Sequence, residues 1–224
     1  MAVKEAKMEQ IAQQVGQEFG FKQVSAHYEP FRDFKVRWHK TSEWIAFSVS
    51  DYMQALTQKA IEDVLTQIFR KMRGDESMYS KNAIKQLTSD KFCEANRYTY
   101  IGRHSTPLTG GEDVKRLQDL IDECREEMGM ENDVIACIAH DPDVERVGLK
   151  GSNLMRVITF SPLFCERSEP LQKALVQCAL TFVSLSFDMD PIERAAAVKL
   201  ATDRYITGPE IIAEYEATGW EKMV

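Results

Sequence analysis

The sequence predicts an α+β fold: a small mixed or antiparallel sheet with a β-hairpin that packs against several helices. Apolar and polar residues alternate over residues 34–49, as they do in strands with one buried face. Apolar residues recur at helical spacing over residues 8–19, 61–72 and 114–128. We find no internal sequence repeat and no interdomain linker, so we expect the chain to form a single domain, 1–224.

The amino-terminal part of the chain predicts a helix, a strand and then the hairpin. The helix covers residues 3–19 and ends at Gly20, because glycine readily takes the left-handed conformation of a helix cap. Strand-forming residues follow over residues 21–28. In the hairpin, alternation predicts one buried face that consists of Phe34, Val36, Trp38, Ile45, Phe47 and Val49.

The carboxyl-terminal part predicts one long loop and two further strands. Residues 97–111 contain a proline and a glycine pair, which favour a loop. The two strands cover residues 134–139 and 154–160, and an acidic loop, 140–151, connects them.

Three further helices complete the chain, and residues 190–193 have the cap, first-turn proline and third-position glutamate that begin the middle one. A strongly apolar helix covers residues 168–187, and a short last helix covers about residues 208–217. The uninterrupted part of the apolar helix, 174–187, is shorter than the roughly 20 apolar residues that cross a bilayer. We therefore expect a buried central helix and no membrane partner.

Charge and cysteine usage limit the classes of function. The net charge of -7 disfavours a broad electrostatic grip on nucleic acid or on an anionic membrane. Residues 1–10 mix charged and small residues and lack the apolar stretch of a secretion signal. The five cysteines form no CxxC pair, a pattern typical of reduced thiols. These features together predict a cytoplasmic protein.

Several short strings resemble a known family of enzymes. They lie in the hairpin (34–38 and 44–47), directly after it (51–52), and before the apolar helix (156–161). In these strings, and in the order of elements over about residues 20–200, the chain resembles the small zinc metallopeptidases of the YgjP-like, or minigluzincin, type. The resemblance implies a zincin-like core over that range.

The resemblance also implies a metal site that this chain lacks. Such peptidases carry HExxH on the helix after the last strand, with two histidines on one metal and a glutamate that activates water. No histidine follows His140 here, and Gln177, Cys178 and Thr181 stand at the approximate positions of the motif. We therefore expect no metal, no cofactor and no zinc hydrolysis. The polar stripe is either a former site that now binds something else or a seam satisfied by neighbouring backbone.

Other residues are candidates for ligand binding. Arg37 and His39 share a face of the hairpin, which Trp44 can join, and such a face suits an anion or a nucleobase. His104 lies in the predicted loop 97–111, and His140 opens the acidic loop. For each of them, a solvated strand face or a plain turn is the structural alternative.

Three functions follow from these observations. The first is a catalytically inactive, metallopeptidase-like protein, a pseudoenzyme, that serves as a binding or regulatory module for a protein or a small molecule. The second is an enzyme of other hydrolytic chemistry, with histidine, cysteine and aspartate side chains that only the fold brings together. The third is a nucleic-acid accessory protein that uses the basic face of the hairpin, against which the acidic composition argues.

Overall fold

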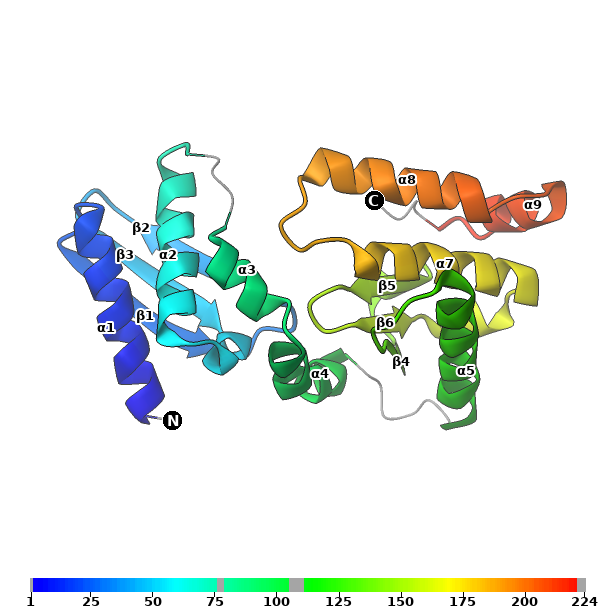
Figure 1. Cartoon of the computed structure of the whole chain (residues 1–224), viewed down its shortest axis with the longest axis horizontal. Helices are drawn as coiled ribbons and strands as arrows, with labels where there is room; N and C mark the ends of the chain where they lie inside the picture. The colour runs from blue at the N-terminus through cyan, green and yellow to red at the C-terminus, as the bar shows by residue number, and fades with distance from the viewer. Residues whose placement is uncertain (1, 76–78, 105–110, 221–224) are drawn as a thin grey trace. The chain divides into compact units, whose positions relative to one another are not determined.

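The computed structural model describes the backbone of residues 2–75, 79–104 and 111–220, and side chains from residue 5 onward (Figure 1). Its helices and two small sheets confirm the α+β fold class. We expected one domain over 1–224, whereas the backbone contacts divide the chain into two compact units, Met1–Asn96 and Arg97–Val224.

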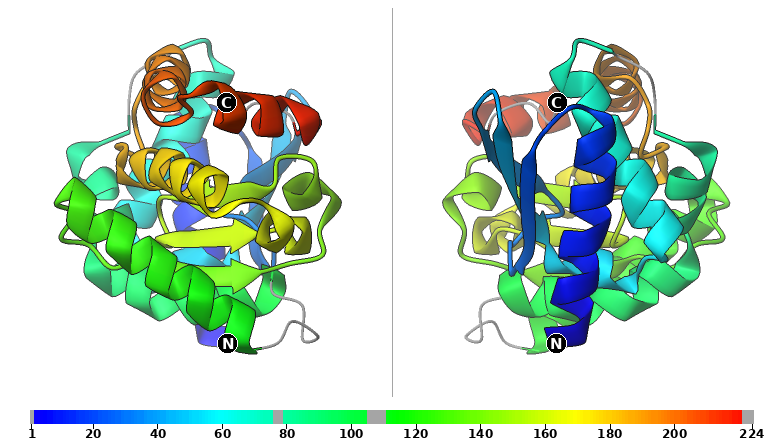
Figure 2. Two further views of the ribbon diagram at one scale, coloured as in Figure 1. Left: turned by 90° about the vertical axis from the view of Figure 1, so that its right-hand side faces the viewer. Right: turned by 90° about the vertical axis from the view of Figure 1, so that its left-hand side faces the viewer.

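The first unit contains a three-stranded mixed sheet and helices on one of its faces (Figure 2). Its elements are α1 (Ala2–Glu18), β1 (Gln23–Glu29), β2 (Val36–Lys40), β3 (Trp44–Ser50), a 3-10 turn η1 (Asp51–Ala55), α2 (Gln58–Met72), α3 (Lys81–Leu87) and the start of α4 (Asp90–His104). The strand order is β1-β3-β2. The predicted hairpin is confirmed as the antiparallel pair β2 and β3, while β1 pairs parallel to β3.

The core of the first unit lies between this sheet and helices α1 and α2, which Figure 2 shows on the same side of the strands. The ring of Phe69 on α2 stacks on Phe19 at 5.0 Å and meets Phe47 of β3 edge-on at 5.2 Å. Gly16 lets α1 approach the sheet, because a Cβ atom at this position would stand 2.3 Å from Val24. The opposite face of the sheet carries polar side chains, as the alternation predicts.

The second unit contains another three-stranded sheet. Its elements are the end of α4, α5 (Gly111–Met128), β4 (Ile135–Ile138), α6 (Pro142–Glu145), β5 (Leu149–Ser152), β6 (Val157–Phe160), a 3-10 turn η2 (Pro162–Glu166), α7 (Glu169–Ser184), α8 (Pro191–Tyr205) and α9 (Pro209–Ala217). The order is β4-β6-β5, with β4 parallel and β5 antiparallel to β6. The predicted acidic loop 140–151 therefore contains α6 and most of β5.

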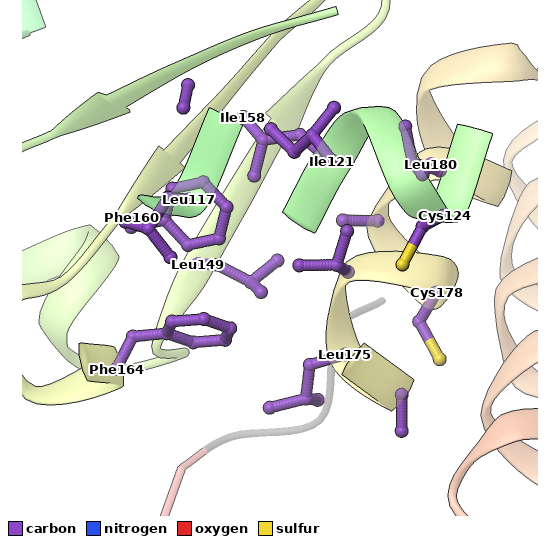
Figure 3. Packing of buried hydrophobic residues seen from close by; sticks show 14 of the residues in the cluster. Leu117, Ile121, Cys124, Leu149, Ile158, Phe160, Phe164, Leu175, Cys178 and Leu180 are labelled. Carbon is purple, nitrogen blue, oxygen red and sulfur yellow. The ribbon is translucent and has the colours of Figure 1, made fainter. Parts of the chain in front are cut away.

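Helices α5 and α7 bury one face of the second sheet (Figures 2 and 3). In the close-up, Leu117 and Ile121 of α5 and Leu175 of α7 belong to the same cluster as the strand residues Leu149, Ile158 and Phe160. Gly151 of β5 accommodates α7, because a Cβ atom there would lie 3.0 Å from Phe182. The apolar helix is thus a core element, as expected.

The two units share one topology. Each runs helix, strand, hairpin, 3-10 turn and helix, and in each sheet the first strand is parallel to the central third strand. The N-cap residues match as well. Ser50 precedes the 3-10 turn and Thr57 the following helix in the first unit, and in the second unit Ser161 and Ser168 take the same places at the same spacing. The repeated order of elements thus has no counterpart in a sequence repeat.

A glutamine clamps the outer edge of the first strand in both sheets. In the second unit, Gln118 on α5 accepts a hydrogen bond from Ala136 N at 2.9 Å and donates to Val134 O at 2.9 Å. In the first unit, Gln13 on α1 accepts from Val24 N at 2.9 Å and donates to Lys22 O at 3.5 Å. An amide presents the donor and acceptor that a neighbouring strand would present, so the start of each of these edges is already occupied.

Helix α4 carries the chain from the first unit into the second. Asn96 donates from its side chain to Tyr52 O at 3.2 Å in the first unit. Arg97, the next residue, donates from Nε to Met155 O at 3.0 Å and forms an ion pair with Asp133 in the second. The predicted loop 97–111 is therefore wrong for residues 97–104, which are helical, while residues 105–110 lie outside the described part of the chain.

Candidate functional site

The polar stripe on α7 is satisfied by neighbouring groups. Thr181 donates from its hydroxyl to Gln177 O at 2.9 Å, and Ser184 donates to Thr181 O at 2.7 Å. The amide of Gln177 donates to Glu127 of α5 at 3.3 Å in an exposed position. This is the arrangement that a structural seam predicts, since each hydroxyl bonds to a carbonyl of its own helix.

Cys178, at the predicted place of the catalytic glutamate, is fully buried and belongs to the core of the second unit (Figure 3). Burial raises the pKa of its thiol to about 12, although a hydrogen bond with Thr202 acts in the opposite direction. Burial likewise raises the pKa of Cys124 and of Cys137 to about 11. Because the thiolate is the nucleophilic form, these three cysteines are poorly suited to covalent catalysis.

His104 and His140 lie on different elements of the second unit. His104 is buried on α4, where its ring stacks on Tyr100 at a centroid distance of 3.9 Å and its Nδ1 lies 2.8 Å from Tyr100 O. His140 is half-exposed after β4, and its Nδ1 lies 3.5 Å from a carboxylate oxygen of Glu145. Among the residues with described coordinates, no three His, Cys, Asp or Glu side chains gather as metal ligands.

The first sheet, in contrast, brings its predicted ligand-binding residues onto one face. The register places Arg37 beside Ser48, and Ser48 beside His27, in one row across the three strands. The next row contains His39, Ala46 and Ser25, and Trp44 stands one row further along β3. We name this surface the open face and define it by Arg37, His39, Trp44, His27 and Ser48.

The open face is exposed and partly ordered by its own contacts. Trp44 retains 40% of its surface, and Arg37, His39 and His27 are exposed as well. His27 Nε2 lies 3.1 Å from the hydroxyl of Ser48, which holds the imidazole over the middle strand. The sequence did not single out His27 for binding, because its partner Ser48 is revealed only by the parallel pairing of β1 and β3.

Two cations share one aromatic platform at the end of this face. Lys35 Nζ lies 4.8 Å and Arg37 Cζ lies 4.9 Å from the centroid of the Phe31 ring, which is buried. Cation–π contacts of this kind favour a fixed position for the guanidinium group. With His39 and Lys40, residues 35–40 carry four basic side chains and no acidic one.

Trp38 departs from the sequence prediction. Alternation places it on the buried face, and the register indeed sets it beside Phe47, yet 43% of its surface is exposed. The reason is its strand: β2 lies at the edge of the sheet, so only one side of the indole has a neighbouring strand.

Comparisons with protein-family models, with curated proteins and with solved structures found no match in any of the three. Within the described ranges, no helix combines the length and the apolar character needed to cross a membrane.

Proposed function

We propose that this protein is a non-catalytic binding module, and that the open face of the first sheet binds an acidic ligand. The observation that carries the proposal is the gathering of Arg37, His39 and Trp44 on one exposed face of a chain with a net charge of -7. Anionic groups are attracted by the cations, while the indole offers an apolar, stackable surface.

The relation to minigluzincin-type peptidases remains part of this proposal. It is supported by the order of elements, because in each unit a helix follows the third strand through a 3-10 turn. The strings that carry the resemblance, however, are divided between the units: the hairpin strings lie in the first and residues 156–161 in the second. The proposed loss of metal chemistry rests on Gln177, Cys178 and Thr181, none of which offers an imidazole or a carboxylate.

The alternative of a hydrolytic enzyme gains no specific support from the geometry. It would require His104, His140 and a cysteine to meet in one cleft, but the two histidines lie on different elements with contacts of their own. We therefore keep the binding module as the proposed function.

The test is titration of the full chain with poly-L-glutamate at low salt, monitored by tryptophan fluorescence. We expect binding that weakens steeply with added salt, and about fivefold or more weaker binding for Arg37→Ala. Lys85→Ala, which removes an exposed cation on α3, is the matched control and should bind like the wild type. Absence of binding at low salt, or equal losses in both variants, would refute the proposed function.

A further inference from the structure

Strand β2 presents a free edge in the first sheet. The hydrogen bonds from Ser50 N to Lys35 O (3.0 Å) and from Thr41 N to Trp44 O (2.9 Å) mark the odd-numbered residues as those bonded to β3. Antiparallel pairing alternates, so Val36, Trp38 and Lys40 direct their N–H and C=O groups away from the sheet. In the part of the chain that the structure describes, these outward groups have no protein partner.

This edge differs from the opposite edge of the same sheet. The glutamine clamp of Gln13 occupies the outward groups at the start of β1, as Gln118 does for β4 in the second unit. No side chain of the described residues clamps the edge of β2 in this way, and an exposed row of unpaired backbone groups is a template for another strand.

The side chains along this edge select among occupants. Residues 35–40 contribute four basic side chains, so a second copy of β2 across a two-fold axis would oppose Arg37 and Lys40 with like charges. An acidic strand would instead be attracted, because its carboxylates would lie beside Arg37 and His39 on the open face. Its apolar side chains would lie on the other face, beside the exposed indole of Trp38. Charge complementarity therefore favours an acidic segment over self-association.

We propose that β2 accepts an extended acidic segment of a partner protein as a fourth strand, with acidic residues at alternate positions. The inference rests on the proposed function and deepens it, because the added strand would place its carboxylates on the open face. Main-chain hydrogen bonds to Val36, Trp38 and Lys40 supply the affinity, and alternation of the bound side chains supplies the specificity.

The experiment uses the full chain and a labelled eight-residue peptide that alternates valine and glutamate. In one counterpart the backbone nitrogens of the valines carry methyl groups, which removes the N–H donors on one edge of the peptide. In a second counterpart the backbone nitrogens of the glutamates carry them, which removes the donors on the other edge. Methylation leaves the charge unchanged. We expect one of the two counterparts to bind about tenfold more weakly than the parent peptide, since only one peptide edge faces β2.

A protein variant tests the same edge from the other side. Trp38→Pro removes an outward N–H while the bonds of residues 37 and 39 to β3 remain, and Trp38→Ala removes the indole but keeps the N–H. We expect the proline variant to bind the peptide several-fold more weakly than the alanine variant. The methylated peptides keep the test valid if the proline variant fails to fold.

The outcomes separate the inference from the proposed function. Equal binding of the parent and both methylated peptides would overturn strand addition, while Arg37-dependent binding of poly-L-glutamate would still support the open face. If an oligo-dT strand binds more tightly than the peptide and displaces it, the partner is a nucleic acid and the inference is wrong. If neither the peptide nor poly-L-glutamate binds at low salt, both proposals fail.

Discussion

At the scale of single residues, the side chain of Gln118 holds two backbone groups at the edge of the second sheet. Substitution by alanine would leave Ala136 N and Val134 O without their partner. Because unpaired, part-buried backbone groups are costly, we expect Gln118→Ala to lower the free energy of unfolding by about 1–3 kcal/mol. Denaturant unfolding measures this loss.

The neighbouring exposed residue Lys115 provides the control, since Lys115→Ala changes the same helix without touching the sheet. Its effect should stay within about 0.5 kcal/mol. Equal stabilities of the two variants would contradict the role assigned to the glutamine clamp.

The buried thiols predict a loss of stability in alkali. Folding raises the pKa of Cys124 and Cys137 to about 11 and of Cys178 to about 12, from an ordinary value of 9.0. Between pH 9 and those values the unfolded chain loses the thiol protons while the folded chain keeps them, so stability falls as the pH rises through this window.

Denaturant unfolding at a series of pH values measures this fall, and alkylation of the thiols checks their burial. At pH 8 in the folded protein, iodoacetamide should leave Cys124, Cys137 and Cys178 unmodified, and unfolding in urea should expose all three to modification. Rapid labelling of Cys178 in the folded state, located by peptide mass spectrometry, would show that it is accessible and ionised.

Alternation in the sequence predicts the face on which a strand side chain lies, but neither its exposure nor its partners. Alternation correctly places Arg37, His39 and Trp44 on one face, because that pattern depends only on the pleat of the strands. The exposure of Trp38 depends on which strand is at the edge, and alternation carries no information about strand order. The contact between His27 and Ser48 requires pairing of strands that are distant along the chain.

At the scale of elements, the packing of α1 on the first sheet depends on Gly16. Alanine is the better helix former by about 1 kcal/mol, but its Cβ would stand 2.3 Å from Val24 and 3.2 Å from Phe69. Steric overlap should therefore outweigh propensity, and we expect Gly16→Ala to destabilise the protein by about 1–3 kcal/mol in thermal or denaturant unfolding.

Gly102 on α4 is the matched control, because a Cβ there would meet no atom within 4 Å. Gly102→Ala should stabilise the protein by about 0.5–1 kcal/mol through helix propensity alone. Effects of the same sign in the two variants would contradict this account of α1 packing.

Elements with a regular apolar pattern were predictable from the sequence, and elements without one were not. The hairpin and the apolar helix α7 follow directly from their periodicity. The end of α4 was mistaken for a loop because two of its buried positions are the polar residues Arg97 and His104, which leave Tyr100 without an apolar stripe around it. Strand β5 has only four residues, too few for a reliable alternation signal.

At the scale of the whole molecule, the shared topology of the two units is hidden from the sequence. The connection from α1 to β1 is shorter than that from α5 to β4, and only in the second unit does a short helix, α6, lie between the first and second strands. Unequal connections remove any fixed period, and different apolar residues fill the two cores equally well. The two units still correspond in strand order, in the spacing of the N-cap residues and in the glutamine clamps, because these features determine the course of the backbone.

Two units with separate cores predict separate local unfolding. The second core consists only of residues of the second unit, and the aromatic cluster around Phe69 consists only of residues of the first. In native-state hydrogen exchange, Gln118→Ala should therefore accelerate the amides of β4 and β6 by about tenfold while β1 and β3 change little. Gly16→Ala should produce the converse pattern. Uniform acceleration of all strands by either variant would mean that the chain unfolds as one cooperative body, and the single domain predicted from the sequence would then be the better description of its energetics.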